Sequence, residues 1–133
     1  MGHVETIVAA MAAGVGHREI QLAQTRYRLD LVRRWGIRPG ASVLEIGCGQ
    51  GDMTAVLADA VGTSGRVVGV DIADPSYGSP VTLGESAAFL AATELGARVD
   101  MRFGVDVLDP AVTFGDDGFD HVVLAHCAWY FAS

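Results

Sequence analysis

The sequence predicts an α/β domain built on a parallel sheet, and three observations lead to this prediction. Short apolar runs alternate along the chain with longer helical patterns, as in strands joined by helical crossovers. A glycine-rich turn, Gly47-Cys-Gly-Gln-Gly51, directly follows the first apolar run. Asp71 ends the second apolar run, about 20 residues beyond the turn, which is the spacing typical of nucleoside-binding α/β domains.

Length and composition restrict the function classes. The chain has 133 residues, which suits one domain, and a net charge of −7, which repels phosphate backbones. It contains no lysine, which excludes P-loop and Schiff-base lysine chemistry. No run approaches the roughly 20 apolar residues of a membrane span, and residues 1–16 lack a basic signal-peptide start. We therefore expect a soluble, cytoplasmic protein with neither nucleic acid nor membrane as a partner.

The expected elements follow from apolar periodicity and from turn residues. Residues 1–16 are predicted to be a flexible arm or lid, and residues 17–133 the domain. Residues 17–35 form an amphipathic helix whose apolar positions share one face: Ile20, Ala23, Tyr27, Leu31 and Trp35. Strands are predicted over 42–46, 66–71, 98–103 and 119–125, and helices over 52–61 and 83–96. Residues 73–82 and 109–118 form loops.

The glycine turn and its neighbouring acids separate two cofactors. A dinucleotide site requires Gly-x-Gly-x-x-Gly/Ala, whereas Asp52 stands in the sixth position here and Glu45 precedes the turn. Two carboxylates repel a diphosphate but attract the cationic sulfonium and ammonium groups of S-adenosylmethionine. Asp71 is suited to accept hydrogen bonds from ribose hydroxyls, which fits either cofactor. Simpler readings stay open: a tight strand-to-helix connection for the turn, and a cap or turn residue for Asp71.

Two stretches carry a family resemblance. LEIGCGQG over 44–51, followed by VVGVD over 67–71, resembles motif I and the acidic loop of class I S-adenosylmethionine-dependent methyltransferases. Residues 103–107 and 119–125 are similar to the third and fourth strands of that family. The resemblance implies a Rossmann-like sheet in the order 3-2-1-4 and methyl transfer to a small-molecule acceptor, with S-adenosylmethionine as the cofactor.

The resemblance also implies roles for individual residues. Glu45 and the turn residues Gly47, Cys48, Gly49 and Gly51 would border the methionine moiety. Asp71 would hold the ribose and Ile72 would pack on the adenine. Asp106 would accept from the adenine amino group, with the Val107 backbone nearby, and the region from His126 to Tyr130 would lie beside the sulfonium and the acceptor.

The last residues leave alternatives open. His126 is either a general base or a histidine satisfied at a strand end, and the aromatic residues 129–131 are either a substrate wall or core. The four histidines show no metal-ligand spacing, so no metal is expected, and no catalytic residue is assigned.

The chain stops eight residues after the fourth predicted strand, whereas the family's fold normally has seven strands. We therefore expect a fragment or truncated product that self-associates through the apolar edge of strand four. Two rival functions are a non-catalytic cofactor-binding remnant or partner subunit, and a nicotinamide-dependent oxidoreductase, which Asp52 opposes.

Overall fold

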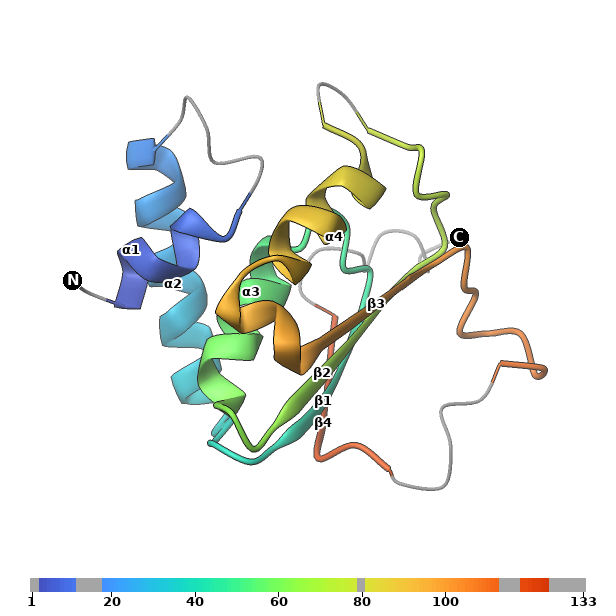
Figure 1. Cartoon of the computed structure of the whole chain (residues 1–133). Coiled ribbons are helices and arrows are strands. Elements are labelled where there is room, and N and C mark those ends of the chain that lie inside the picture. The colour runs from blue at the N-terminus through green and yellow to red at the C-terminus, as the bar shows by residue number, and fades with distance from the viewer. Residues whose placement is uncertain (1–2, 12–17, 79–80, 113–117, 125–133) are drawn as a thin grey trace.

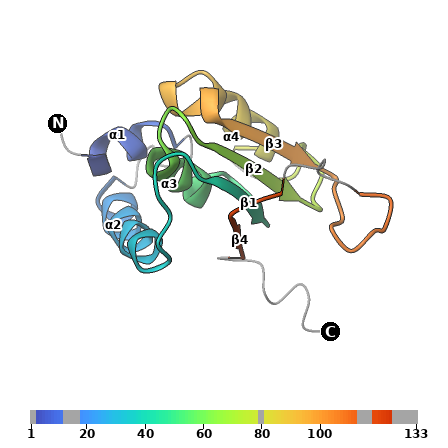
Figure 2. The same ribbon diagram turned by 90° about the horizontal axis from the view of Figure 1, so that it is seen from below.

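The computed structural model describes residues 3–11, 18–78, 81–112 and 118–124. In this part of the chain the strands are β1 (Ser42–Ile46), β2 (Arg66–Asp71), β3 (Val99–Phe103) and β4 (His121–Val123). They form one parallel sheet in the order β3-β2-β1-β4 (Figures 1 and 2). The predicted fold class and strand order are confirmed.

The described helices pack against one face of this sheet (Figure 1). They are α1 (His3–Ala9), α2 (Arg18–Arg34), α3 (Asp52–Val61) and α4 (Leu83–Ala91), followed by the 3-10 helix η2 (Glu94–Arg98). Val43 and Val67 of the sheet meet Val56 of α3 in the core between these layers, and all three are fully buried. No described helix is long and apolar enough to cross a membrane.

The opposite face of the sheet is covered differently. Leu44, Val68 and Val70 are buried there beneath Val105, Val107 and Phe119, which belong to the segments after β3 and before β4. Because side chains alternate along a strand, Val43 and Glu45 of β1 point toward the helices while Leu44 points away from them. The carboxyl group of Glu45 thus lies on the helix side of the sheet, where it meets α3.

Residues 3–11, part of the predicted arm or lid over 1–16, pack against the rest of the domain. Residues 3–9 form α1, and Ile7 of that helix is fully buried in the main core. Met11, just beyond the helix, is 4% exposed. A segment that buries side chains in the core is held by hydrophobic contacts, so α1 is part of the packed domain.

The face of α2 that contacts the core is not the apolar one. Ile20, Tyr27 and Trp35, on the face expected from periodicity, are 58%, 62% and 40% exposed. The buried stripe consists instead of Gln21, Thr25, Arg28 and Val32. Periodicity identifies the residues that share a helix face, but it does not say which face a neighbouring helix covers. Here the polar stripe is the face that lies against α3.

Most element boundaries agree with the sequence prediction, and the exceptions have local causes. The helix expected over 83–96 ends at Ala91, and the separate helix η2 follows. A Cβ atom on Gly96 would lie 2.5 Å from the Ala91 Cα, so this glycine permits η2 to fold back closely on α4. The third strand begins at Val99 rather than at residue 98 because η2 continues to Arg98. The described part of the fourth strand, His121–Val123, is shorter than the predicted 119–125.

Candidate functional site

A glycine turn connects β1 to α3 at the carboxyl end of the sheet. Gly47, Gly49 and Gly51 have φ angles of 81°, 52° and 90°, a region that residues with a Cβ atom rarely adopt. A Cβ atom on Gly49 would meet nothing within 4 Å, whereas one on Gly51 would lie 3.3 Å from the Met101 Cε. Gly49 thus presents bare backbone to open space, and Gly51 lets the start of α3 pack beneath β3.

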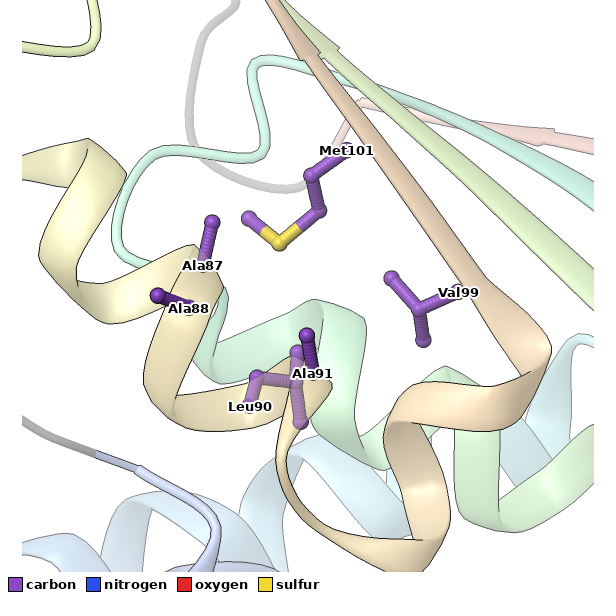
Figure 3. Close-up of a pocket in the computed structure, with 6 residues that line it drawn as sticks. All are labelled: Ala87, Ala88, Leu90, Ala91, Val99 and Met101. Carbon is purple, nitrogen blue, oxygen red and sulfur yellow. The ribbon is translucent and has the colours of Figure 1, made fainter.

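The pocket next to Gly51 is lined by apolar side chains. It lies between α4 and β3, has a volume of about 260 Å³, and is shown in Figure 3 with Met101 extending across it toward α4. Its lining is aliphatic apart from the Met101 thioether: Ala87, Ala88, Leu90, Ala91, Val99 and Met101. Such a pocket offers no charged group or hydrogen-bond donor to orient a ligand, so the candidate site is the turn itself.

Asp71, at the end of β2, joins the turn to the second strand. Its Oδ2 accepts a hydrogen bond from the Gly49 N–H at 2.9 Å, and its Oδ1 accepts one from the Ala73 N–H, also at 2.9 Å. A carboxylate has about four lone-pair positions, so each oxygen keeps capacity for a further donor. Asp71 therefore supports the turn and can still accept hydrogen bonds from a diol.

Backbone hydrogen bonds hold the ends of three strands together around this carboxylate. The N–H groups of Gly47 and Cys48 both donate to the Val70 carbonyl, at 2.7 and 3.0 Å. On the other side of β2, the Val105 N–H donates to the Asp71 carbonyl at 3.0 Å. The Gly104 N–H donates to the Ala73 carbonyl at 2.9 Å. The residues after β1, β2 and β3 thus form one rigid edge.

Most of the residues predicted for the site lie along this edge. Ile72, which follows β2 directly, is 62% exposed and is free to pack on a flat apolar ligand. Asp106 is exposed, and its Oδ1 accepts a hydrogen bond from the Leu108 N–H at 2.9 Å. Val107 packs against the buried residues on the sheet face opposite the helices. His126 lies outside the described residues.

Glu45 does not line an open site, because its side chain is buried against α3. It is 1% exposed, and the Thr54 hydroxyl of α3 donates a hydrogen bond to its Oε1. Burial raises the pKa of Glu45 to about 8, although the Thr54 hydrogen bond and the positive charge of Arg28 act in the opposite direction. Glu45 is therefore largely protonated at neutral pH in the free chain.

Cys48 contributes backbone to the turn, but its side chain has no reactive role. The thiol is buried, and a Cβ atom on Gly69 of β2 would lie 3.0 Å from the Cys48 Cβ. Burial, together with the nearby carboxyl groups of Glu45 and Asp71, raises the pKa of the Cys48 thiol far above its ordinary value. The thiol therefore stays protonated and serves as a packing group.

Gln50 is a site residue that the sequence reasoning did not single out. Its Nε2 donates to the Val81 carbonyl at 2.9 Å, and its Oε1 accepts a hydrogen bond from the Ser86 hydroxyl of α4. One amide in the glycine turn thereby holds both the end of the loop that follows Asp71 and the first turn of α4. No spacing rule marks a single glutamine in such a turn, so its partners become evident only in the folded chain.

The polar stripe of α2 was also missed. Gln21, Thr25 and Arg28 are 7%, 0% and 9% exposed. Within the described residues, Gln21 Oε1, Thr25 Oγ1, Arg28 Nη1 and Asp52 Oδ1 are buried without a hydrogen-bond partner. Unpartnered buried polar atoms are rare and costly, which marks the region where α2 meets the start of α3 as a place for a polar ligand. The repeat of polar residues at positions 21, 25 and 28 could have revealed this stripe.

The fold and the site together define a Rossmann-like domain for a nucleoside-containing cofactor. Comparison with known proteins specifies the class. The family model of protein-L-isoaspartate(D-aspartate) O-methyltransferases matches residues 9–77, just over half of the chain. The chain belongs to this family of class I S-adenosylmethionine-dependent methyltransferases.

Individual relatives agree with the family match. The chain is 40% identical over 106 residues to nocamycin O-methyltransferase of Saccharothrix syringae, covering 80% of this chain and 33% of the relative. It is 40% identical over 98 residues to demethylmenaquinone methyltransferase of Lysinibacillus sphaericus, covering 74% of this chain and 37% of the relative. The chain thus spans about a third of the length of these curated relatives.

A solved structure covers nearly the whole chain. The cyclopropane-fatty-acyl-phospholipid synthase-like protein of Lactobacillus casei is 47% identical, with a TM-score of 0.89. The similarity covers 97% of this chain and 48% of that protein. The architecture described above therefore also occurs as about half of a longer chain.

Proposed function

We propose that this chain provides the S-adenosylmethionine-binding part of a methyltransferase that acts on a small-molecule acceptor in the cytoplasm. The observation that carries the proposal is the position of Asp71. Its carboxylate supports the bare glycine turn through Gly49 and retains acceptor capacity toward the open side. A carboxylate in this position suits the ribose of a nucleoside cofactor, and Asp52, in the sixth position of the turn, disfavours a diphosphate.

The residues present fit this cofactor. The Gly47–Gly51 backbone would border its amino-acid portion, and Asp71 would accept hydrogen bonds from its ribose hydroxyls. Ile72 offers an exposed apolar side chain for the adenine, and Asp106 keeps one carboxylate oxygen, Oδ2, for the adenine amino group. Glu45 stays assigned to the methionine end, but it acts from beneath the turn because its side chain is buried against α3.

When bound, S-adenosylmethionine supplies an electrophilic methyl group on a cationic sulfonium. An acceptor oxygen, nitrogen or carbon would take that methyl group, and S-adenosylhomocysteine would leave as the C–S bond breaks. The contribution of this chain is to hold the reactants in position, which can account for a large part of the rate enhancement without a dedicated acid or base. The fixed strand edge around Asp71 suits this role. We propose no catalytic residue among the described ones.

Two observations support a small-molecule acceptor. The relatives at 40% identity are named for nocamycin and for demethylmenaquinone, both small molecules. The net charge of −7 disfavours a nucleic-acid acceptor. The family model takes its name from a protein acceptor, an isoaspartyl residue, and this is the alternative that an assay must include.

Thermal unfolding with added ligand tests the cofactor, because a ligand that binds only the folded state raises the melting temperature. S-adenosylhomocysteine should raise it, and NAD should leave it unchanged. A labelled-methyl assay with a phenol, an amine and an isoaspartyl peptide then tests transfer. Incorporation into the peptide alone would replace the small-molecule acceptor by a protein one. Binding without turnover would indicate that this chain acts only as a cofactor-binding part. A shift with NAD alone would refute the proposal.

A further inference from the structure

Helix α2 carries an apolar stripe on its outer side. Ile20, Ala23, Tyr27 and Trp35 are exposed there, and Leu31 is half-buried among them. Residues at these spacings lie on one side of a helix, so they form a continuous stripe. The buried residues of α2 face α3 instead, and Figure 2 shows α2 at the margin of the domain. Within the described part of the chain, the stripe is left uncovered.

Two hollows lie along the apolar stripe. One has a volume of about 390 Å³ and is lined by residues in or next to the stripe: Ala23, Gln24, Tyr27, Arg28 and Leu31. The other is the cavity of about 480 Å³ that Trp35 shares with β4. Trp35 therefore joins the stripe to the open edge of the sheet. An exposed apolar surface with hollows that can accept side chains is typical of a protein–protein contact.

The apolar stripe matches itself when its direction is reversed. In two antiparallel helices related by a twofold axis at Tyr27, residues equally far before and after Tyr27 face each other. Ala23 and Leu31 lie four residues to either side of Tyr27, so a small side chain would meet a large one. Ile20 and Trp35, seven and eight residues away, would meet at each end. Apolar residues thus meet apolar residues along the whole stripe.

The charges beside the stripe show the same reversed symmetry. Glu19, Arg26, Asp30 and Arg33 are exposed and follow one another along a single flank of α2. The twofold axis keeps this flank on the same side in both copies. Glu19 would then approach Arg33 of the second copy, and Arg26 would approach Asp30 of the second copy. Each pair is offset by two positions, about 3 Å along the helices, which side chains of this length can span.

We propose that two copies of this chain associate through antiparallel α2 helices, with the twofold axis at Tyr27. Each copy presents the same apolar stripe and the same charged flank, as a closed twofold contact requires. An anionic lipid surface would attract the arginines of this flank but would repel Glu19 and Asp30, whereas a second copy satisfies both signs. The inference goes beyond the proposed function and does not depend on which cofactor the glycine turn binds.

Analytical ultracentrifugation of the full chain tests the contact. The unsubstituted chain should dimerise with rising concentration. Tyr27→Glu places two carboxylates next to each other at the axis and should raise the dissociation constant of the dimer roughly 100-fold. Tyr77→Glu makes the same change at an exposed tyrosine outside α2 and should have no effect. Because both tyrosines are exposed, both variants should keep the circular dichroism spectrum of the unsubstituted chain.

A charge exchange tests the antiparallel arrangement. Arg26→Glu and Asp30→Arg each place like charges opposite one another across the twofold axis. Each variant alone should therefore dimerise roughly tenfold more weakly than the unsubstituted chain. In a mixture of the two variants, both pairs again join opposite charges. The mixture should form a heterodimer with an affinity close to that of the unsubstituted dimer.

The outcomes separate this contact from its alternatives. Loss of the dimer in Tyr27→Glu, together with a heterodimer in the mixture, supports the proposal. A dimer that Tyr27→Glu leaves intact would overturn it and assign association to the edge of β4 alone. A mixture that associates no better than its components would refute the antiparallel arrangement. A chain that stays monomeric but binds phosphatidylglycerol vesicles, and loses this binding in Tyr27→Glu, would make the stripe a lipid-contacting surface instead.

Discussion

The carboxylate of Asp71 accepts a hydrogen bond from the Gly49 N–H at 2.9 Å, although 22 positions separate the two residues in the sequence. The contact links the end of the second strand to the turn after the first strand. Gly49 presents no side chain on the open side, and Asp71 leaves lone pairs free. The same pair of residues thus shapes the turn and offers a ligand acceptor beside it.

Asp71→Ala should weaken S-adenosylhomocysteine binding by roughly 1.5–3 kcal/mol, the scale of hydrogen bonds to a charged group. The loss has two sources, the missing acceptors for the ribose and the missing support for Gly49. Calorimetric titration measures it. Asp74→Ala is the control, because the exposed Asp74 carboxylate contacts only Ser76 among the described residues. An unchanged dissociation constant in Asp71→Ala would leave Asp71 with a purely structural role.

Glu45 should make stability depend on pH. Its folded-state pKa, raised to about 8, exceeds the ordinary glutamate pKa of 4.5, so the folded chain holds a proton that the unfolded chain releases. This contribution to stability is fully present below pH 4.5 and is lost as the pH rises from there through about 8. Its magnitude is on the order of a few kcal/mol.

Glu45→Gln removes the titration and keeps the shape of the side chain. Urea unfolding between pH 5 and 9 should therefore show a flatter profile for Glu45→Gln than for the unsubstituted chain, with the largest gain in stability above about pH 8. Glu94→Gln, which changes an exposed glutamate, should leave the slope unchanged. Parallel profiles for the unsubstituted chain and Glu45→Gln would show that Glu45 is ionised in the folded state.

Gln50→Ala should loosen the loop between β2 and α4. The substitution removes the hydrogen bonds to the Val81 carbonyl and the Ser86 hydroxyl, each contributing about 1 kcal/mol net. The free energy of unfolding should fall by roughly 1–2 kcal/mol, measured by urea denaturation. Gln24→Ala, on the exposed side of α2, is the control. An equal unfolding midpoint for the unsubstituted chain and Gln50→Ala would mean that other contacts hold the loop.

Self-association through the edge of β4 stays a prediction, and the exposed side chains there provide a test. Val122 and Leu124 are 55% and 46% exposed, and together with Trp35 they line a cavity of about 480 Å³. Apolar surface beside a strand edge favours pairing with a second chain. Sedimentation should show concentration-dependent association that Val122→Lys reduces. A monomer at every concentration would remove this edge as an interface.

The strand pattern of the sequence was sufficient to predict the sheet. The apolar runs at 42–46 and 66–71 became β1 and β2 residue for residue, because short buried strands between glycine-rich turns have few alternatives. The side-chain environments were harder to predict. Glu45 was expected beside an open site, yet alternation along β1 places it on the helix side with Val43. That consequence required knowing which face the helices cover.

Helix α2 illustrates the remaining limit. Its apolar positions were recognised, but Ile20 and Tyr27 point outward while Thr25 and Arg28 are buried. The choice between two faces depends on how α2 packs on α3 and the rest of the core. Packing between elements far apart in sequence leaves no local pattern, so only the folded chain shows this arrangement.

The edge around Asp71 and Gly49 should bind a phosphate-free nucleoside cofactor. Side-by-side calorimetric titration of the chain with S-adenosylhomocysteine and with NAD tests it most directly. We expect saturable binding of S-adenosylhomocysteine that Asp71→Ala weakens, and no heat of binding with NAD. Saturable binding of NAD, with none of S-adenosylhomocysteine, would contradict it.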